Sequence, residues 1–274
     1  MTSLAELRDS RELLVNLTQR EVRGKYKRSV FGQAWSLLNP LAQVLVFTLV
    51  FSLFLRIPPD VGDPSGLRSF ALQLLAALLP WAFFANAVSG GMSSLLTNSN
   101  LVKKVYFPRE VLVASTVFSL NVTFAIELLV LLVAAVVMGG FGVVPYLVVV
   151  PYLVAALTAF GLGLGLALSV ANVYFRDTSQ FVGIGLQVWF YLTPVIYTLD
   201  YVAEQDVEVL GRSPEQFLAL NPMTHFVECF RNVFYDFRFP SVGDLLLVGL
   251  FGAVSLVLGY LVFRRFEGRL AEEL

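Results

Sequence analysis

The stretch REVRGKYKRSVFGQAWSLLNP, from Arg20 to Pro40, sets the organisation of the chain. Five basic residues fall within its first nine positions, and the sequence is then apolar and almost uncharged until Arg56. Lys and Arg accumulate on the cytoplasmic side of membrane spans, because they resist transfer across the bilayer and contact anionic headgroups. The stretch is therefore typical of the cytoplasmic entry into a membrane span. The adjoining span argues against a nucleic-acid-binding patch.

The composition extends this interpretation to the whole chain. Of its 274 residues, 57% are hydrophobic and only 14% are charged, and the mean hydropathy is +0.74, whereas a soluble domain carries about a quarter charged residues. So much apolar surface cannot be hidden inside one water-facing globule, which predicts an all-α integral membrane protein. Cys229 is the only cysteine and His225 the only histidine. The sequence therefore predicts no disulfide and no metal site, and His225 is interpreted as a polar surface residue.

Six segments reach the length of about 20 largely apolar residues that a spanning helix needs. They cover residues 34–55, 69–96, 111–138, 144–174, 181–199 and 245–263. A loop rich in Pro and Gly separates the first two, and a glycine cluster at 139–142 separates the third from the fourth. Gly161 and Gly165, in the fourth span, form a G-x-x-x-G pair that allows close helix approach, within the subunit or between subunits.

The positions of the basic residues predict the orientation of these spans. With the N-terminus inside, 14 of the 19 Lys and Arg residues fall on the cytoplasmic side. Both termini are therefore predicted to be cytoplasmic, in a multi-pass protein of the bacterial cytoplasmic (inner) membrane, and Cys229 is predicted to lie on the outer side. Residues 1–33 form a cytoplasmic amphipathic and basic segment, and residues 34–274 form the transmembrane domain.

Two further segments show amphipathic patterns. Near the N-terminus, four leucines recur at helical spacing among charged residues: Leu4, Leu7, Leu14 and Leu17. They predict a helix that lies in the inner membrane interface or packs on protein. Residues 200–244 carry eight acidic residues but also one apolar helical face, made of Phe226, Phe230, Val233 and Phe234. Short amphipathic or re-entrant helices are expected there, at the outer face.

Several side chains inside the predicted spans are candidates for a translocation path. Glu127 falls in the middle of the third span, where a charged group usually faces a bundle interior or a wet cavity. It is either a gate residue or a buried carboxyl that packs helices together. Aromatic rings in the first, second and fifth spans can contact a sliding cargo, although interfacial belts and simple packing are alternatives. The candidate rings are Phe47, Phe51, Trp81, Phe84, Trp189 and Tyr191.

Two short inner loops mix charge with aromatic residues, which suits docking onto a cytosolic partner. One is LVKKVYFPREVL and the other is NVYFRDTSQF. Ordinary positively charged inner turns are the alternative. The candidate docking residues are Leu101, Lys103, Lys104, Tyr106, Phe107, Pro108, Arg109, Arg176 and Asp177.

Five motifs carry a family resemblance, in this order: RGKYKRSVFGQAWSLLNPL, NLVKKVYFPREVL, NVYFRDTSQF, LTPVIYTL and NPMTHFVECFRNVFYD. Together they span nearly the whole chain. They resemble the permease subunits of type-2 ABC exporters, most closely the branch that exports lipid-linked polysaccharides such as O antigens, teichoic acids and related cell-wall glycans.

The resemblance implies a homodimer of six-helix subunits above two copies of a separate ATPase. Residues 100–109 would then be the coupling helix that sits in a cleft of the ATPase, and the N-terminal helix would touch it too. Residues 200–244 would supply two re-entrant gate helices, and aromatic rings would line a channel between the subunits.

The function expected from the sequence is that of a permease subunit that moves a lipid-linked polysaccharide across the cytoplasmic membrane. No loop of the form G-x-x-x-x-G-K-[ST] and no catalytic triad is present, so ATP and magnesium are expected on the partner and no enzyme activity or cofactor on this chain. An exporter of drugs or other hydrophobic small molecules is an alternative. So is a passive channel or a secondary transporter that uses Glu127 for proton coupling.

Overall fold

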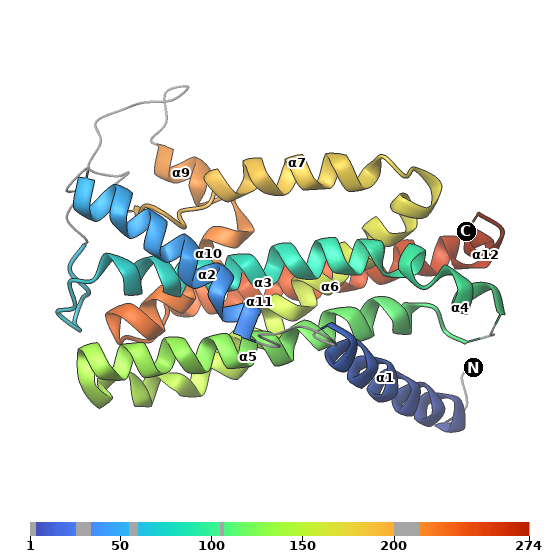
Figure 1. The fold of residues 1–274 in the computed structure, drawn as a ribbon, viewed down its shortest axis with the longest axis horizontal. Helices are drawn as coiled ribbons and strands as arrows, with labels where there is room; N and C mark the ends of the chain where they lie inside the picture. Colours follow the sequence, from blue (N-terminus) through green and yellow to red (C-terminus); the bar gives the residue numbers. More distant parts are fainter. Residues whose placement is uncertain (1–3, 26–33, 55–59, 105–106, 200–213, 274) are drawn as a thin grey trace.

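The protein is an elongated bundle of helices, shown in Figure 1. The computed structural model describes residues 4–25, 34–54, 60–104, 107–199 and 214–273. All regular secondary structure in these ranges is helical, so the prediction of an all-α protein is confirmed for the described residues. Three helical stretches are long and apolar enough to cross a membrane, at Phe70–Thr97, Glu110–Tyr174 and Val242–Phe266.

The predicted spans correspond to helices with small shifts at their ends. The helices in these regions are α2 (Ala34–Phe47) with the π-helix η1 (Thr48–Phe54), α3 (Phe70–Thr97), α5 (Glu110–Gly139), the 3-10 helix η2 (Gly140–Val149) with α6 (Val150–Tyr174), α7 (Thr178–Tyr191) and α11 (Val242–Phe266). The fifth prediction was wrong at its C-terminal end, because α7 stops at Tyr191 and residues 192–198 form turns around Pro194. Proline cannot donate the backbone hydrogen bond that would continue the helix.

The apolar stretch from 110 to 174 folds back on itself. Gly140 has a φ of 74°, a conformation that residues with a β-carbon rarely adopt. The chain reverses there, and α5 and α6 then run side by side in opposite directions (Figure 1). This single stretch therefore contains the third and fourth predicted segments.

Helix α3 is the centre of the bundle. Of its most apolar window, 78% is buried inside the protein, against 17% for α11. Small residues allow α6 to approach both neighbours closely: Gly161 contacts Ala87 and Gly165 contacts Gly91 on α3. On its other side, Gly163 leaves no room for a β-carbon against α11. The G-x-x-x-G pair thus packs helices within the subunit.

Helix α1 (Leu4–Lys25) is longer than the leucine pattern indicated and packs against α5. Leu17 is buried and Leu14 is half-buried against the core, whereas Arg11 and Glu12 are exposed. The alternative in which this helix packs on protein is therefore observed for its C-terminal half. Its position in a membrane interface stays a prediction.

The predicted outer segment contains α9 (Pro214–Leu218), α10 (Pro222–Arg231) and the π-helix η3 (Asn232–Asp236). Its amphipathic face is fully inside the protein, since Phe226, Phe230, Val233 and Phe234 are all buried. The loop that precedes α3 is attached to it, because the Tyr235 hydroxyl donates hydrogen bonds to the backbone oxygens of Asp60 and Leu67. These contacts join residues about 170 positions apart into one end of the bundle.

Candidate functional site

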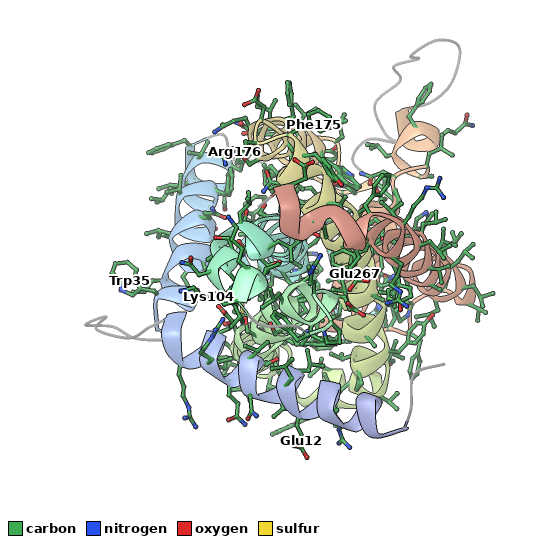
Figure 2. The ribbon with its side chains drawn as sticks, turned by 90° about the vertical axis from the view of Figure 1, so that its right-hand side faces the viewer. Glu12, Trp35, Lys104, Phe175, Arg176 and Glu267 are labelled. Carbon is green, nitrogen blue, oxygen red and sulfur yellow. The ribbon has the colours of Figure 1, made fainter. Side chains whose placement is uncertain are left out.

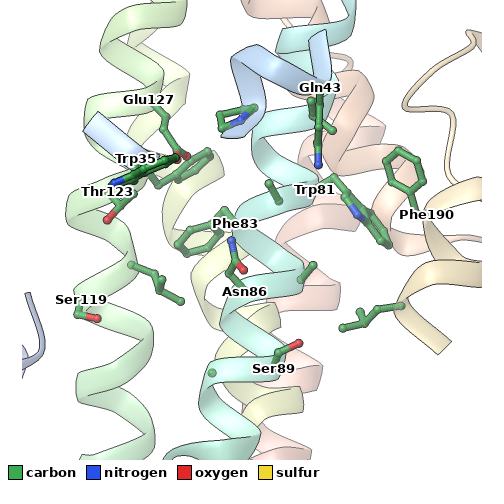
Figure 3. A pocket seen from close by; sticks show the side chains of 18 of the residues that line it. Trp35, Gln43, Trp81, Phe83, Asn86, Ser89, Ser119, Thr123, Glu127 and Phe190 are labelled. Carbon is green, nitrogen blue, oxygen red and sulfur yellow. The ribbon is translucent and has the colours of Figure 1, made fainter. Parts of the chain in front are cut away.

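A long groove runs along one flank of the bundle between α2, α3, α5 and α7, and its lining includes Glu21 and Gly24 of α1. Figure 3 shows part of this lining. Its volume is about 1450 Å³. Both apolar rings and polar side chains line it, among them Trp81, Phe83, Asn86, Ser119 and Glu127. Its length along the helices and its mixed lining suit an extended amphipathic ligand better than a compact one.

Four of the seven predicted path residues line this groove, namely Phe47, Trp81, Glu127 and Tyr191. Phe51 stacks on Phe70, with ring centroids 6.1 Å apart. Phe84 is completely buried and stacks on Phe160, with centroids 5.1 Å apart. The structure therefore brings Phe84 into the core, beside the ring of Trp189.

An aromatic cluster behind the groove joins four helices. It consists of Trp81, Phe84, Phe160, Trp189 and Phe226. Trp189 extends the cluster by a polar contact, because its Nε1 donates a hydrogen bond of 2.7 Å to the side-chain oxygen of Asn221. Asn221 is also the N-cap of α10. The wall of the groove is thus attached directly to the start of α10.

Sequence reasoning identified Glu127 but missed the row of polar residues on α5 to which it belongs. Thr116, Ser119, Thr123 and Glu127 lie at spacings of three and four residues, and all line the groove. Figure 3 shows Ser119, Thr123 and Glu127 along one side of α5. Residues at this spacing share one helix face, so a search for polar residues in the 111–138 segment would have found the row.

Glu127 is 8% exposed and lies beside Trp35 of α2 in the close-up view. The carboxyl is thus both in the lining of the groove and largely shielded. This position is compatible with both hypotheses for Glu127: a functional residue in the path, and a carboxyl that packs helices together.

The candidate docking residues gather at the end of the bundle where both termini lie (Figures 1 and 2). Helix α4 (Ser99–Lys104) buries Val102 and exposes Lys103 and Lys104. Arg176 and Asp177 are exposed in the turn between α6 and α7. Two loops far apart in the sequence therefore present charged side chains at the same end.

The other candidates at this end differ in accessibility. Leu101 and Phe107 are partly buried against the core, Pro108 is exposed, and Tyr106 lies outside the described residues. Arg109 donates a hydrogen bond from its guanidinium to the backbone oxygen of Glu267, after α11. Arg109 thus holds the C-terminal segment against the start of α5.

The structure corrects the interpretation of His225 as a surface residue and shows that Cys229, for which only a side of the membrane was predicted, is buried. His225 is no free surface residue, because Nδ1 lies 2.8 Å from an Asp244 carboxylate oxygen and Nε2 lies 2.9 Å from the backbone oxygen of Ala219. Cys229 is completely buried on α10. A thiol reagent in solution therefore cannot reach it in the folded protein. Cys229 lies on the buried face of α10, whereas His225 lies at its edge, half-buried.

The long apolar helices define the class as an integral membrane protein, with a groove along its flank and charged side chains at the end where both termini lie. Comparison of the sequence with known protein families defines the class of this protein more narrowly. The model of the ABC-2 type transporter family matches residues 12–235, and the chain belongs to this family.

Relatives of known function match along almost the full chain. An O-antigen export system permease protein, RfbA, from Myxococcus xanthus is 33% identical over 97% of this chain and 96% of its own length. An RfbA from Klebsiella pneumoniae is 27% identical over 95% of this chain and 94% of its own. The polysialic acid transport protein KpsM from Escherichia coli is 22% identical over 90% and 91%.

Proposed function

We infer that this chain is the permease subunit of an ATP-driven exporter that moves a lipid-linked polysaccharide of the O-antigen type across the cytoplasmic membrane. The observation that carries the inference is the full-length similarity to O-antigen permeases. The groove supports it, because rings and hydroxyls together suit a polymer of sugars. Sugar rings have apolar faces that stack on aromatic side chains and hydroxyl edges that form hydrogen bonds.

The groove is open along the flank of a single chain, and we propose that a second copy closes it. Such a homodimer would enclose the cargo between two sets of α2, α5 and α7. In this arrangement the chain crosses the membrane six times, with α2–η1 and α7 as the two shorter spans. Helices α10 and η3 form the re-entrant outer gate within residues 200–244.

The inner end would dock two copies of a cytosolic ATPase, which bind ATP and magnesium. Lys103 and Lys104 on α4, with Arg176 and Asp177 on the next inner turn, are exposed as docking requires. Arg20 on α1 donates a hydrogen bond of 2.7 Å to the side-chain oxygen of Asn98, directly before α4. Movement of α4 would thus reach α1 as well as α3. Both termini lie in the cytoplasm in this proposal.

Reconstitution tests the proposal. The chain is purified with its ATPase and placed in proteoliposomes that contain an undecaprenyl-diphosphate-linked oligosaccharide. We expect ATP-dependent transfer of the glycan to the opposite leaflet, detected by a lectin that cannot cross the membrane. Transfer of a fluorescent hydrophobic drug with no transfer of any lipid-linked glycan would contradict the proposal.

A further inference from the structure

His225 connects three parts of the end of the bundle that contains α10. Its Nδ1 lies 2.8 Å from a carboxylate oxygen of Asp244, in the first turn of α11, and its Nε2 lies 2.9 Å from the backbone oxygen of Ala219, before α10. The ring of Phe251, further along α11, stacks on the imidazole with centroids 6.1 Å apart. The His225 side chain is only 14% exposed. Water therefore has little room to replace either oxygen as a partner of the ring.

The two oxygens together require a charged ring. A backbone oxygen and an ionised carboxylate can only accept hydrogen bonds. Neutral imidazole has one N–H donor and satisfies one of the two oxygens, whereas imidazolium donates to both. Aspartic acid ordinarily loses its proton at a much lower pH than histidine does, and the other oxygen of Asp244 already accepts a hydrogen bond of 2.6 Å from the Ser241 hydroxyl. The shared proton therefore belongs on His225.

The surrounding charges favour the same state. The hydrogen bond to Asp244 is the main cause that raises the pKa of His225 above its ordinary value of 6.5, and burial opposes this change. Of the other helices that pack against α10, α3 contains no charged residue, and the titratable residues of α6 are tyrosines. The charged or titratable groups of the described residues near the ring, on α10, η3 and the start of α11, are Glu228, Cys229, Arg231, Asp236 and Asp244.

This inference rests on the proposed role of α10 in the outer gate. We propose that His225 is a positioning residue that holds α10 against α11 through its protonated ring, so that the outer gate loosens when the medium outside becomes alkaline. Loss of the proton breaks one of the two hydrogen bonds and removes the ion pair with Asp244. The pKa of His225 is higher in the folded than in the unfolded protein. The stabilisation is therefore complete below pH 6.5 and is lost as pH rises through the raised value.

The experiment measures how tightly α10 is held at each pH. The complete complex of this chain and its ATPase, in nanodiscs and without nucleotide, is followed by hydrogen exchange and mass spectrometry. The measured quantity is the protection factor of the α10 backbone amides, which is the exchange rate of unstructured peptide divided by the observed rate at the same pH. We expect this factor to fall about tenfold or more between pH 6 and pH 9, because a charge-assisted hydrogen bond is lost. The amides of α6 should change little.

Three variants assign the effect. His225→Gln is neutral at every pH, so α10 should be less protected at pH 6 and the fall should disappear. Asp244→Asn keeps an acceptor oxygen but removes the charge that favours imidazolium, so the fall should move to lower pH. Asp236→Asn is the matched control, because it removes a second titrating group near α10, whose pKa burial raises to about 6. This control should keep the fall above pH 6.5.

The outcomes separate the inference from the function on which it rests. Constant protection of α10 from pH 6 to pH 9 in the unmodified complex would overturn the inference. So would an undiminished fall in His225→Gln, or an unshifted fall in Asp244→Asn, with α6 still protected. Hydrogen exchange needs no substrate. A complex that shows the expected fall but transfers no lipid-linked glycan would therefore contradict the proposed function and leave His225 as the residue that positions α10.

Discussion

Trp189 donates its indole proton to Asn221, and this hydrogen bond of 2.7 Å attaches the end of α7 to the start of α10. The same asparagine donates from its amide to the Leu192 oxygen at 3.0 Å and to the Thr193 hydroxyl at 2.9 Å. It also accepts from the backbone nitrogen of Met223, as an N-cap. One side chain therefore holds the turn after α7 and the first turn of α10 together.

Replacement of Asn221 tests how much this attachment contributes to the stability of the folded protein. Asn221→Ala removes a helix cap and leaves the partly buried Trp189 N–H unpaired, so we expect a loss of about 1–3 kcal/mol of stability. Ser241→Ala is the matched control, because the hydrogen bonds of the Ser241 hydroxyl stay within its own helix: it accepts from the Asp244 nitrogen and donates to the Asp244 carboxylate. Thermal unfolding in detergent measures both variants. Equal losses would mean that Asn221 acts as a cap alone.

The exposed lysines of α4 are predicted to hold the ATPase. Lys103→Glu combined with Lys104→Glu reverses two charges without removing a buried contact, since both side chains are exposed. We expect co-purification of the ATPase to fall about tenfold or more, because like charges across an interface are strongly unfavourable.

Permease abundance in membranes controls for folding in that experiment. Arg68→Glu, an exposed charge reversal on the loop before α3, should leave ATPase binding intact. Normal binding in the double variant would remove α4 from the docking surface.

Two neighbouring rings of α3 are expected to differ in role. Both rings belong to the aromatic cluster, but Trp81, which is 6% exposed, also lines the groove, whereas Phe84 is completely buried. Trp81→Leu should slow glycan export by about fivefold or more, by analogy with the roughly 1–3 kcal/mol that a nucleic-acid base gains when it stacks on an aromatic side chain. Phe84→Leu should instead lower the unfolding midpoint through lost packing. Export assays and thermal unfolding on both variants check the distinction. Normal export in Trp81→Leu would mean that Trp81 serves only to pack the helices.

Cysteine labelling tests the orientation of the bundle. Asp63→Cys and Glu273→Cys place thiols at exposed positions near opposite ends, and the buried Cys229 can remain in place. In cells without an outer barrier, an impermeant maleimide should label Asp63→Cys and leave Glu273→Cys unlabelled until the membrane is opened. The reverse pattern would invert the topology. Labelling of Cys229 should require denaturation.

Stability should depend on pH through Asp236 at the end of η3. Burial is the main cause that raises the pKa of Asp236 from 3.8 to about 6. Between these values the folded state binds more protons than the unfolded state, so stability falls as pH rises from about 4 to about 6. The change is at most about 3 kcal/mol. Asp236→Asn should flatten this part of the profile of unfolding midpoint against pH, and an unchanged slope would contradict the assignment.

The sequence determined the class of the protein and most of its helices. Apolar segments of spanning length and the basic cluster at 20–28 predict membrane helices by themselves, because the bilayer imposes the same requirement on every spanning segment. The family motifs are likewise local. They suffice to predict the function and the inner docking loops without any knowledge of packing.

Only the tertiary structure decided which face of each helix lies in the core and which lines the groove. The sequence grouped Trp81 and Phe84 as aromatic path candidates of one span, but packing buries Phe84 completely against α6 and α7, whereas one side of Trp81 still lines the groove. Cys229 falls at helical spacing on the predicted apolar face of Phe226 and Phe230, but only the packing shows that this face is completely buried. In a uniformly apolar helix the pattern of hydrophobic residues cannot distinguish lipid from protein, since both are apolar. The polar row on α5 became a site only when α2, α3 and α7 enclosed it.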